Sequence, residues 1–265
     1  MNIYRKTLII YFCFLIPVII FIMLFSLQTD NPLRTYLIIA GSLILGDILF
    51  LKIKTRIYRY FYKKYMNIID EELDPEKFIS LTENEYSGVK NKKYRNYMKI
   101  NLCLGYFAKG NMEKAYDYLI NVETSGVTGI AKTDKVVYYY NLILILYNLN
   151  RKSEAVEVYN EYREAYETDL KYKNKRKEIE NLIEYMELLL FHEIKYDEMI
   201  KILEKTLEMP LSKRFEFSLK YDLAVYYEKI GKSEKAEKFY KEVAEKGNKL
   251  YIVEIARKEL EKFVK

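Results

Sequence analysis

Two long apolar runs stand out in the first quarter of the chain, and the remainder alternates apolar and polar positions. The first run extends from Thr7 to Leu27 without a charged residue, and the second, from Thr35 to Ile53, contains one acid and one late lysine. Each run is long enough to cross the hydrocarbon core of a bilayer, which takes about 20 helical residues. With a short turn between them, the pattern predicts a two-helix transmembrane hairpin over residues 1–54, with spans at about 7–27 and 33–53.

The charges beside these runs favour an uncleaved hairpin with both ends in the cytoplasm. A secretory signal peptide also begins with basic residues, here Arg5 and Lys6, but its apolar core has about 7–15 residues and a cleavage site follows it. Six basic residues lie between Lys52 and Lys64, whereas the turn offers only Arg34. The positive-inside rule therefore places both termini, and everything after the hairpin, on the cytoplasmic side of the cell membrane.

Three residues of the second run are candidates for packing within the membrane. Ser42 and Gly46 are four apart and share a helix face, and small side chains let another helix approach closely. We expect this neighbour to be the first span, with a partner protein as the alternative. Asp47 is the one acid inside a span, where an unpaired charge costs several kcal/mol. We expect it to reach the cytoplasmic interface or to pair with a basic residue, since two helices and one acid are too little for an ion path.

A basic and aromatic segment, residues 55–73, links the hairpin to the rest of the chain. Its tyrosines and basic residues suit lipid head groups, and single-stranded nucleic acid is the alternative ligand. The charge distribution favours lipid, because residues 1–69 carry nine basic and two acidic residues whereas residues 70–265 carry 35 and 36. The basic charge is therefore a membrane-proximal feature, and we expect no nucleic-acid partner.

Residues 74–265 are predicted to be helical throughout, because their apolar positions recur with a period of 3.6 and Gly and Pro are few. Asp74 followed by Pro75 is a typical helix start. The final segment, residues 249–265, is amphipathic and suits a C-terminal capping helix. The predicted fold class is all-α.

Within this helical part, one spacing of small, aromatic and turn residues recurs. In the last copy a small residue is followed by an aromatic three later, a glycine seven later, an alanine twelve later and an aromatic sixteen later. The positions are Ala224, Tyr227, Gly231, Ala236 and Tyr240; upstream the spacing gives Cys103, Tyr106, Gly110, Ala115 and Leu119, then Ile143, Leu146, Asn150, Ala155 and Tyr159. A weaker copy has Met199 and Leu203. This spacing resembles the tetratricopeptide repeat (TPR), although the copies are longer than the usual 34 residues.

The resemblance implies an α-solenoid of antiparallel helix pairs in which the first helix of each pair faces a concave groove. The side chains expected to point into this groove are Leu104, Phe107, Tyr140, Asn141, Leu144, Tyr147, Leu188 and Tyr221. An apolar and aromatic groove suits a helix or an extended peptide of a partner. The alternative is that the protein's own C-terminal tail, or packing between long helices, fills the groove.

No residue pattern predicts catalysis, a metal or a cofactor. The stretch Gly231–Ser233 lacks the preceding glycine and strand of a phosphate-binding loop. His192 is the only histidine, and Cys103 occupies a small packing position of its repeat. The acidic residues alternate with lysines, as on solvated helix faces. We therefore expect a protein that is not an enzyme.

The resemblance and the hairpin together predict a membrane-tethered scaffold or adaptor that captures a protein or peptide in a cytoplasmic TPR-like groove. Two alternatives remain open: a receptor that senses a peptide, and a structural subunit of a membrane complex docked through the hairpin. The abundance of Lys, Ile, Asn and Tyr is typical of AT-rich bacterial genomes. Lipid is expected as the second partner, through the hairpin and the basic segment.

Overall fold

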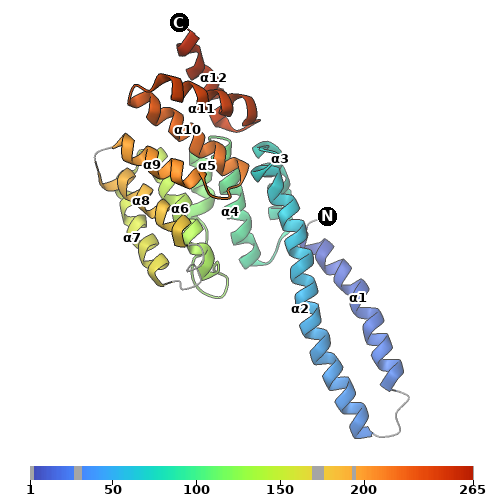
Figure 1. Cartoon of the computed structure of the whole chain (residues 1–265). Coiled ribbons are helices and arrows are strands. Elements are labelled where there is room, and N and C mark those ends of the chain that lie inside the picture. Colours follow the sequence, from blue (N-terminus) through green and yellow to red (C-terminus); the bar gives the residue numbers. More distant parts are fainter. Residues whose placement is uncertain (1–2, 27–31, 169–175, 193–194, 265) are drawn as a thin grey trace. The chain divides into compact units, whose positions relative to one another are not determined.

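The computed structural model describes residues 3–26, 32–168, 176–192 and 195–264 of the chain. Within these residues every regular element is a helix, which confirms the predicted all-α class. The chain divides into two compact units, Met1–Met66 and Asn67–Lys265, whose helices are labelled in Figure 1. The two units are described separately below.

The first unit contains α1 (Ile3–Ser26) and most of α2 (Pro32–Asp70), whose last four residues belong to the second unit. The second unit continues with α3 (Pro75–Gly88), α4 (Lys92–Ala108), α5 (Met112–Ile120), α6 (Lys132–Asn148), α7 (Lys152–Thr168), α8 (Arg176–Phe191), α9 (Tyr196–Leu207), α10 (Lys213–Lys229), α11 (Ser233–Lys246), α12 (Tyr251–Leu260) and the short 3-10 helix η2 (Glu261–Val264).

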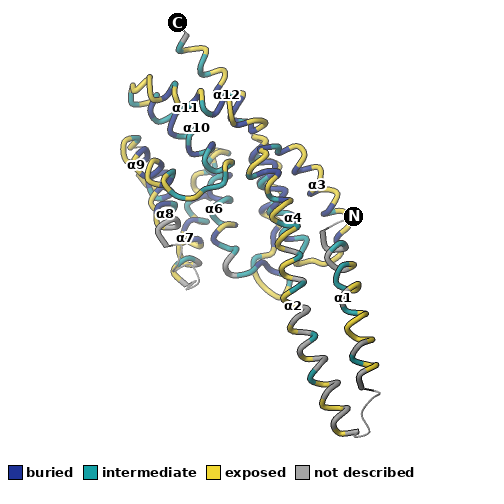
Figure 2. The backbone as a smooth tube through the Cα atoms, turned by 45° about the vertical axis from the view of Figure 1, so that its right-hand side comes forward, coloured by how far each residue is buried: buried dark blue, intermediate teal, exposed yellow. Residues whose placement is uncertain are grey.

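The first unit keeps many large apolar side chains exposed along both helices. Ile16 is 54% exposed, Met23 63% and Leu37 67%. Figure 2 shows the described residues of α1 in the colours of exposed and intermediate burial, in contrast to the dark interior of the second unit.

Among the residues that the structure describes, no helix has both the length and the apolar character that a membrane crossing requires. The predicted hairpin therefore has no support from the structure. A Cβ atom built on Gly46 meets no atom within 4 Å among the described residues, and the packing predicted for this position stays a prediction. The side chains of Ser42 and Asp47 lie outside the described residues.

In the second unit, successive helices lie side by side, and several of them are joined by short turns. Three of these turns have the same geometry, with a residue in the left-handed region at Gly110 (φ +81°), Asn150 (φ 59°) and Gly231 (φ +75°). At Gly110 the amide donates to the Phe107 carbonyl and the next amide, Asn111, donates to Tyr106. The two other turns repeat this pair of bonds, which is the Schellman arrangement that ends a helix and satisfies its last carbonyls.

The residues predicted to pack between paired helices are buried. Ala115, Ala155 and Ala236 have no exposed surface, and Met199 in the weaker copy is equally buried. A small side chain at this position lets the two helices approach closely, so that the neighbouring aromatic residues fill the space around it. Introducing a larger side chain into such a core typically costs about 1–3 kcal/mol.

One further turn shares the left-handed backbone and the five-residue spacing of the other three, and it was not identified from the sequence. Leu73 has a left-handed backbone (φ 56°) at the turn between α2 and α3, and Phe78, five residues later, is fully buried. Each of the three turns described above likewise stands five residues before a fully buried alanine. Leucine and phenylalanine stand where the other turns have glycine or asparagine and a buried alanine, which is why the spacing was not recognised. As predicted, Asp74 caps α3 by accepting a hydrogen bond from the Lys77 amide.

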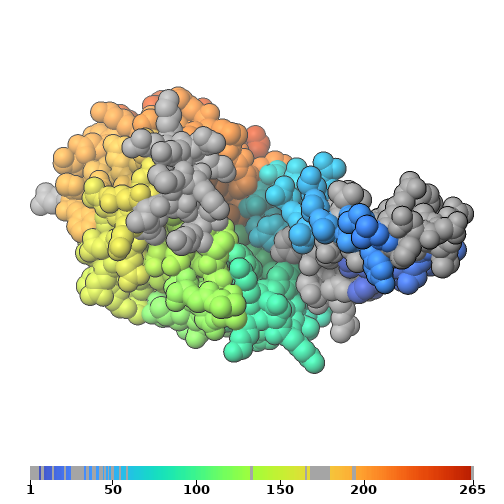
Figure 3. Space-filling model, turned by 90° about the horizontal axis from the view of Figure 1, so that it is seen from below, coloured from blue at the N-terminus to red at the C-terminus, as the bar shows by residue number. Residues whose placement is uncertain are grey.

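The beginning of the second unit contacts the start of α10 and the turn before α12. Arg214 Nε lies 2.9 Å from Asp70 Oδ1, and Lys249 Nζ lies 2.6 Å from Asp74 Oδ2. The Asn248 side-chain amide also donates to the Glu72 carbonyl at 2.6 Å. Figure 3 shows green, yellow and orange following one another in sequence order around this unit. The helix pairs therefore form a closed ring rather than an open arc.

Candidate functional site

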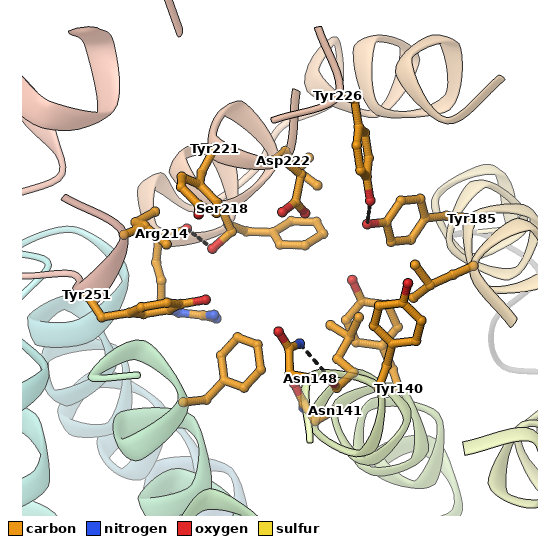
Figure 4. Close-up of a pocket in the computed structure, with 17 residues that line it drawn as sticks. Tyr140, Asn141, Asn148, Tyr185, Arg214, Ser218, Tyr221, Asp222, Tyr226 and Tyr251 are labelled. Atoms are coloured by element: carbon orange, nitrogen blue, oxygen red, sulfur yellow. Dashed lines mark hydrogen bonds between the residues drawn. The ribbon is translucent and has the colours of Figure 1, made fainter. Parts of the chain in front are cut away.

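The ring surrounds a partly open cavity of about 170 Å³. Its walls come from one face of each of α4, α6, α8 and α10, with α12 closing one side (Figure 4). The lining residues are Phe107, Tyr140, Asn141, Leu144, Tyr147, Asn148, Tyr185, Leu189, Arg214, Phe215, Ser218, Leu219, Tyr221, Asp222, Tyr226, Tyr251 and Ile252. On α6 and α10 they recur at intervals of three and four, which is the spacing of a single helix face.

Six of the eight residues expected in the groove line this cavity. They are Phe107, Tyr140, Asn141, Leu144, Tyr147 and Tyr221. Leu188 is instead buried at 9% exposure, and the next residue, Leu189, borders the cavity. Successive side chains of a helix point about 100° apart, so an error of one residue in predicting the inward face of α8 selects the wrong leucine. Leu104 does not border the cavity either, since on α4 only Phe107 does so.

The cavity is rich in phenol groups. Six tyrosines line it, and Tyr185 and Tyr226 are joined by a hydrogen bond of 3.0 Å between their hydroxyls. The two asparagines of α6 donate to backbone carbonyls one turn earlier on the same helix, Asn141 to Val137 and Asn148 to Leu144. Their carbonyl oxygens remain available as acceptors, because the amide nitrogens make these bonds.

Asp222 is the acid among the described residues that line the cavity. Figure 4 shows its carboxylate directed inward from α10. Burial raises the pKa of Asp222 to about 7, against a smaller lowering by the Tyr185 hydroxyl. Asp222 is intermediate in exposure, because it borders the cavity. It therefore changes charge close to neutral pH.

Arg214 is the one basic residue of the described lining, and it is already paired. Its guanidinium binds Asp70 at the closure of the ring, and both side chains are mostly buried, at 20% and 23% exposure. Because the charges of Arg214 and Asp70 offset each other, Asp222 alone determines the net charge of the cavity. At pH values above 7 the cavity is therefore negatively charged.

Several cavity residues were missed by reasoning from sequence, namely Asp222, Arg214, Tyr226 and Tyr251. A signal for Asp222 existed, because Asp222 and Ser218 lie on the face of α10 that Tyr221 marks as inward. Tyr251 had no such signal, because it belongs to the segment predicted only as a cap. The sequence left open whether the protein's own tail fills the groove. Tyr251 and Ile252 of α12 form one wall of it, and the cavity remains beside them.

The residues considered for chemistry stand apart from the cavity. Cys103 is buried at 1% exposure in its packing position, and burial raises the pKa of its thiol to about 12. His192 is exposed just after α8. Within the described residues, no three acidic, histidine or cysteine side chains gather as metal ligands would.

Comparisons of the chain with protein-family models, with curated proteins and with solved structures find no match. The resemblance to TPR proteins therefore rests on the spacing of Cys103, Tyr106, Gly110 and Ala115 and of the corresponding residues in the later copies.

Proposed function

We propose that this protein is a membrane-tethered binding protein of the TPR-like class, whose helical unit takes a short segment of a partner into its central cavity. The observation that carries this proposal is the cavity itself. Residues from five helices converge on it, and their polar groups include a buried carboxyl and six phenols. A core that served only packing would place apolar side chains at such positions, because buried polar groups cost free energy unless they are satisfied.

The size of the cavity favours recognition of a short segment over that of a whole helix. The ring contacts of Asp70 with Arg214 and of Asp74 with Lys249 close the wide groove of an open solenoid. About 170 Å³ accommodates a side chain or a small molecule. This geometry favours the sensing alternative over a scaffold that lays a long helix in an open groove.

Photo-crosslinking in cells tests this binding. A benzophenone amino acid placed at Tyr147, which lines the cavity, is expected to attach to a ligand that mass spectrometry identifies as a peptide segment or a small molecule. The matched control is the same probe at Glu157, which is exposed on α7. Filling the cavity with Ser218→Trp should abolish the Tyr147 product, whereas Ser233→Trp on the exposed start of α11 should leave it unchanged. A Tyr147 product that survives Ser218→Trp contradicts the proposal.

The tether is proposed from the sequence and from the exposed apolar surface. The run from Thr7 to Leu27 carries no charge, and apolar side chains along α1 and α2 are exposed. Basic residues from Lys52 to Lys64 lie where they would meet anionic head groups of the cytoplasmic leaflet. The proposal places both termini and the helical unit in the cytoplasm.

Thiol labelling tests the tether. Cys13 lies in α1 and is exposed in the isolated chain. In intact membranes we expect it to resist a membrane-impermeant maleimide and to react once detergent is added. A Cys103→Ala background removes the second thiol and keeps a small residue in its packing position. Rapid labelling of Cys13 in untreated membranes, or recovery of the protein in the soluble fraction, would exclude the tether.

A structural subunit docked through the first unit is the second candidate, because the same exposed apolar side chains could meet a partner protein. Exposed Ile44 and Ile48 on α2 are the positions to probe. If Ile44→Asn releases the protein from a larger assembly while the cavity crosslink persists, docking through this unit is established.

A further inference from the structure

The charge in the cavity identifies the chemical class of ligand that fits it. Asp222 borders the cavity from α10, and the described lining contains no second acid and no cation other than Arg214. Arg214 is held by Asp70 at 2.9 Å. An ionised carboxylate in such surroundings is costly unless a positive charge comes to it. A neutral or anionic ligand would not offset the free-energy cost of this carboxylate charge.

Phenol groups share the cavity with Asp222. The Tyr185 hydroxyl on α8 lies within hydrogen-bonding reach of its carboxyl group. Tyr221 and Tyr226 lie on the same helix as Asp222, and Tyr140 on α6 and Tyr251 on α12 line other walls of the cavity. The charge of Asp222 contributes to the raised pKa of all five phenols, which places them within its electrostatic reach. Aromatic rings attract cations through the negative faces of their π-systems, and cages of such rings bind alkylated ammonium groups.

We propose that the cavity binds an alkylammonium group, which forms an ion pair with the Asp222 carboxylate inside the cage of Tyr140, Tyr185, Tyr221, Tyr226 and Tyr251. This inference rests on the proposed binding function of the cavity and specifies its ligand. The volume of about 170 Å³ is close to that of an engineered cavity, about 150 Å³, that holds benzene. A four-carbon ammonium ion, or the end of a lysine side chain, therefore fits.

Binding is expected to depend on pH through Asp222. The unoccupied cavity holds this carboxyl group largely protonated below pH 7, since burial raises its pKa to about 7. The other groups that face it are the five phenols and Arg214, which keep one charge state through this range. The ammonium ion binds only the carboxylate, so each pH unit below 7 should weaken binding about tenfold, and the affinity should level off above it.

The test uses the full chain purified in detergent micelles. Calorimetry at pH 8 with butylammonium chloride is expected to give a dissociation constant below about 1 mM. The neutral analogue 1-pentanol should not compete. Asp222→Asn keeps the shape of the side chain and should weaken butylammonium binding at least tenfold, and it also corrects for uptake of the amine by the micelles. The matched control, Asp197→Asn on the exposed start of α9, should bind like the wild type.

Two sources of the ammonium group are distinguished in the same experiment. A lysine side chain is represented by Nα-acetyl-lysine amide, with its Nε-acetylated form as the uncharged control. Competition by the lysine derivative and not by its acetylated form indicates a peptide ligand, whereas binding of butylammonium alone indicates a free amine. Either result supports the ammonium site.

Other results overturn this inference. They are equal binding of butylammonium by the wild type and Asp222→Asn, or equal binding of butylammonium and 1-pentanol. A third is no binding by a folded protein at a butylammonium concentration 20-fold above the expected dissociation constant. If the Tyr147 probe still captures a ligand in cells, the ammonium site alone fails and the proposed binding function stands. If the probe captures nothing as well, both fail.

Discussion

Tyr227 of α10 donates a hydrogen bond to Glu204 of the preceding helix, 23 residues earlier, and Tyr106 of α4 makes the same bond to Glu83 at the same separation. A lysine next to the packing alanine lies over each ring, Lys235 at 4.8 Å from the centroid of Tyr227 and Lys114 at 5.1 Å from that of Tyr106. The recurrence of a glutamate, a tyrosine and a lysine in two copies joins each helix pair to the one before it.

Removing one of these hydroxyls should weaken the junction between neighbouring pairs. Tyr227→Phe deletes the donor and keeps the ring, so we expect a loss of about 1 kcal/mol in the free energy of unfolding. Urea unfolding of Tyr227→Phe, Glu204→Gln and the double variant measures the coupling. If the two single losses add fully in the double variant, the contact contributes nothing.

The two turn glycines should respond differently to alanine. Both have a left-handed backbone, which costs an alanine about 1–2 kcal/mol. A Cβ atom at Gly231 meets nothing within 4 Å, whereas one at Gly110 would lie 2.8 Å from the Tyr251 ring. Gly110→Ala should therefore destabilise the protein more than Gly231→Ala and should also loosen α12.

Hydrogen exchange provides the second readout for these glycines. We expect faster exchange of the α12 amides in Gly110→Ala and unchanged exchange there in Gly231→Ala. Equal free-energy losses with no difference in α12 would show that Tyr251 does not depend on the α4–α5 turn.

Asp74 should stabilise the closed ring at neutral pH. Burial raises its pKa, but the hydrogen bonds and charges of Lys249 and Lys77 outweigh this and lower it below 3.8. A depressed folded-state pKa gives stability that is present above about pH 4 and is lost as the pH falls through the lower value. Asp74→Asn keeps the α3 cap and removes the charge, so its stability deficit should be largest near neutral pH and should shrink in acid.

Unfolding curves of the wild type and Asp74→Asn at several pH values measure this deficit. A deficit that stays constant down to about pH 3 would show that the charge of Asp74 has no role. Asp74→Ala, which also removes the cap, should be less stable than Asp74→Asn at every pH.

Asp222 should have the opposite effect on stability. Its folded-state pKa, about 7, lies above the ordinary value of 3.8, so its contribution is greatest below about pH 4 and is lost as the pH rises through 7. Asparagine does not ionise, so Asp222→Asn does not lose this contribution to stability as the pH rises. We expect the variant to be more stable than the wild type at pH 8, by on the order of 1–3 kcal/mol, because some hydration in the cavity reduces the full effect.

Thermal unfolding of both proteins at pH 4 and pH 8 tests this expectation. Similar stability at pH 4 and a more stable variant at pH 8 is the predicted result. A variant that is less stable at pH 8 would mean that the carboxylate is already compensated inside the protein.

The helices, their turns and their packing positions could be predicted from the sequence because all three depend on local spacing. Gly110, Asn150 and Gly231 stand at the same offset from the buried alanines, and the structure gives all three a left-handed backbone. The turn at Leu73, five residues before Phe78, was missed because leucine and phenylalanine adopt the geometry that other turns form with glycine or asparagine and alanine. Tertiary packing overrides residue preference at this turn.

The inward face of α6 also followed from helical spacing, whereas on α10 only Tyr221 was identified, and Leu104 on α4 and Leu188 on α8 do not border the cavity. The closure of the ring was decided by tertiary structure, because it depends on contacts between residues 144 to 176 positions apart in the chain. No local pattern brings Asp70 to Arg214 or Asn248 to Glu72. That closure turns an open groove into a cavity, and it places Asp222, one of many acids in the sequence, among phenol rings where its charge matters.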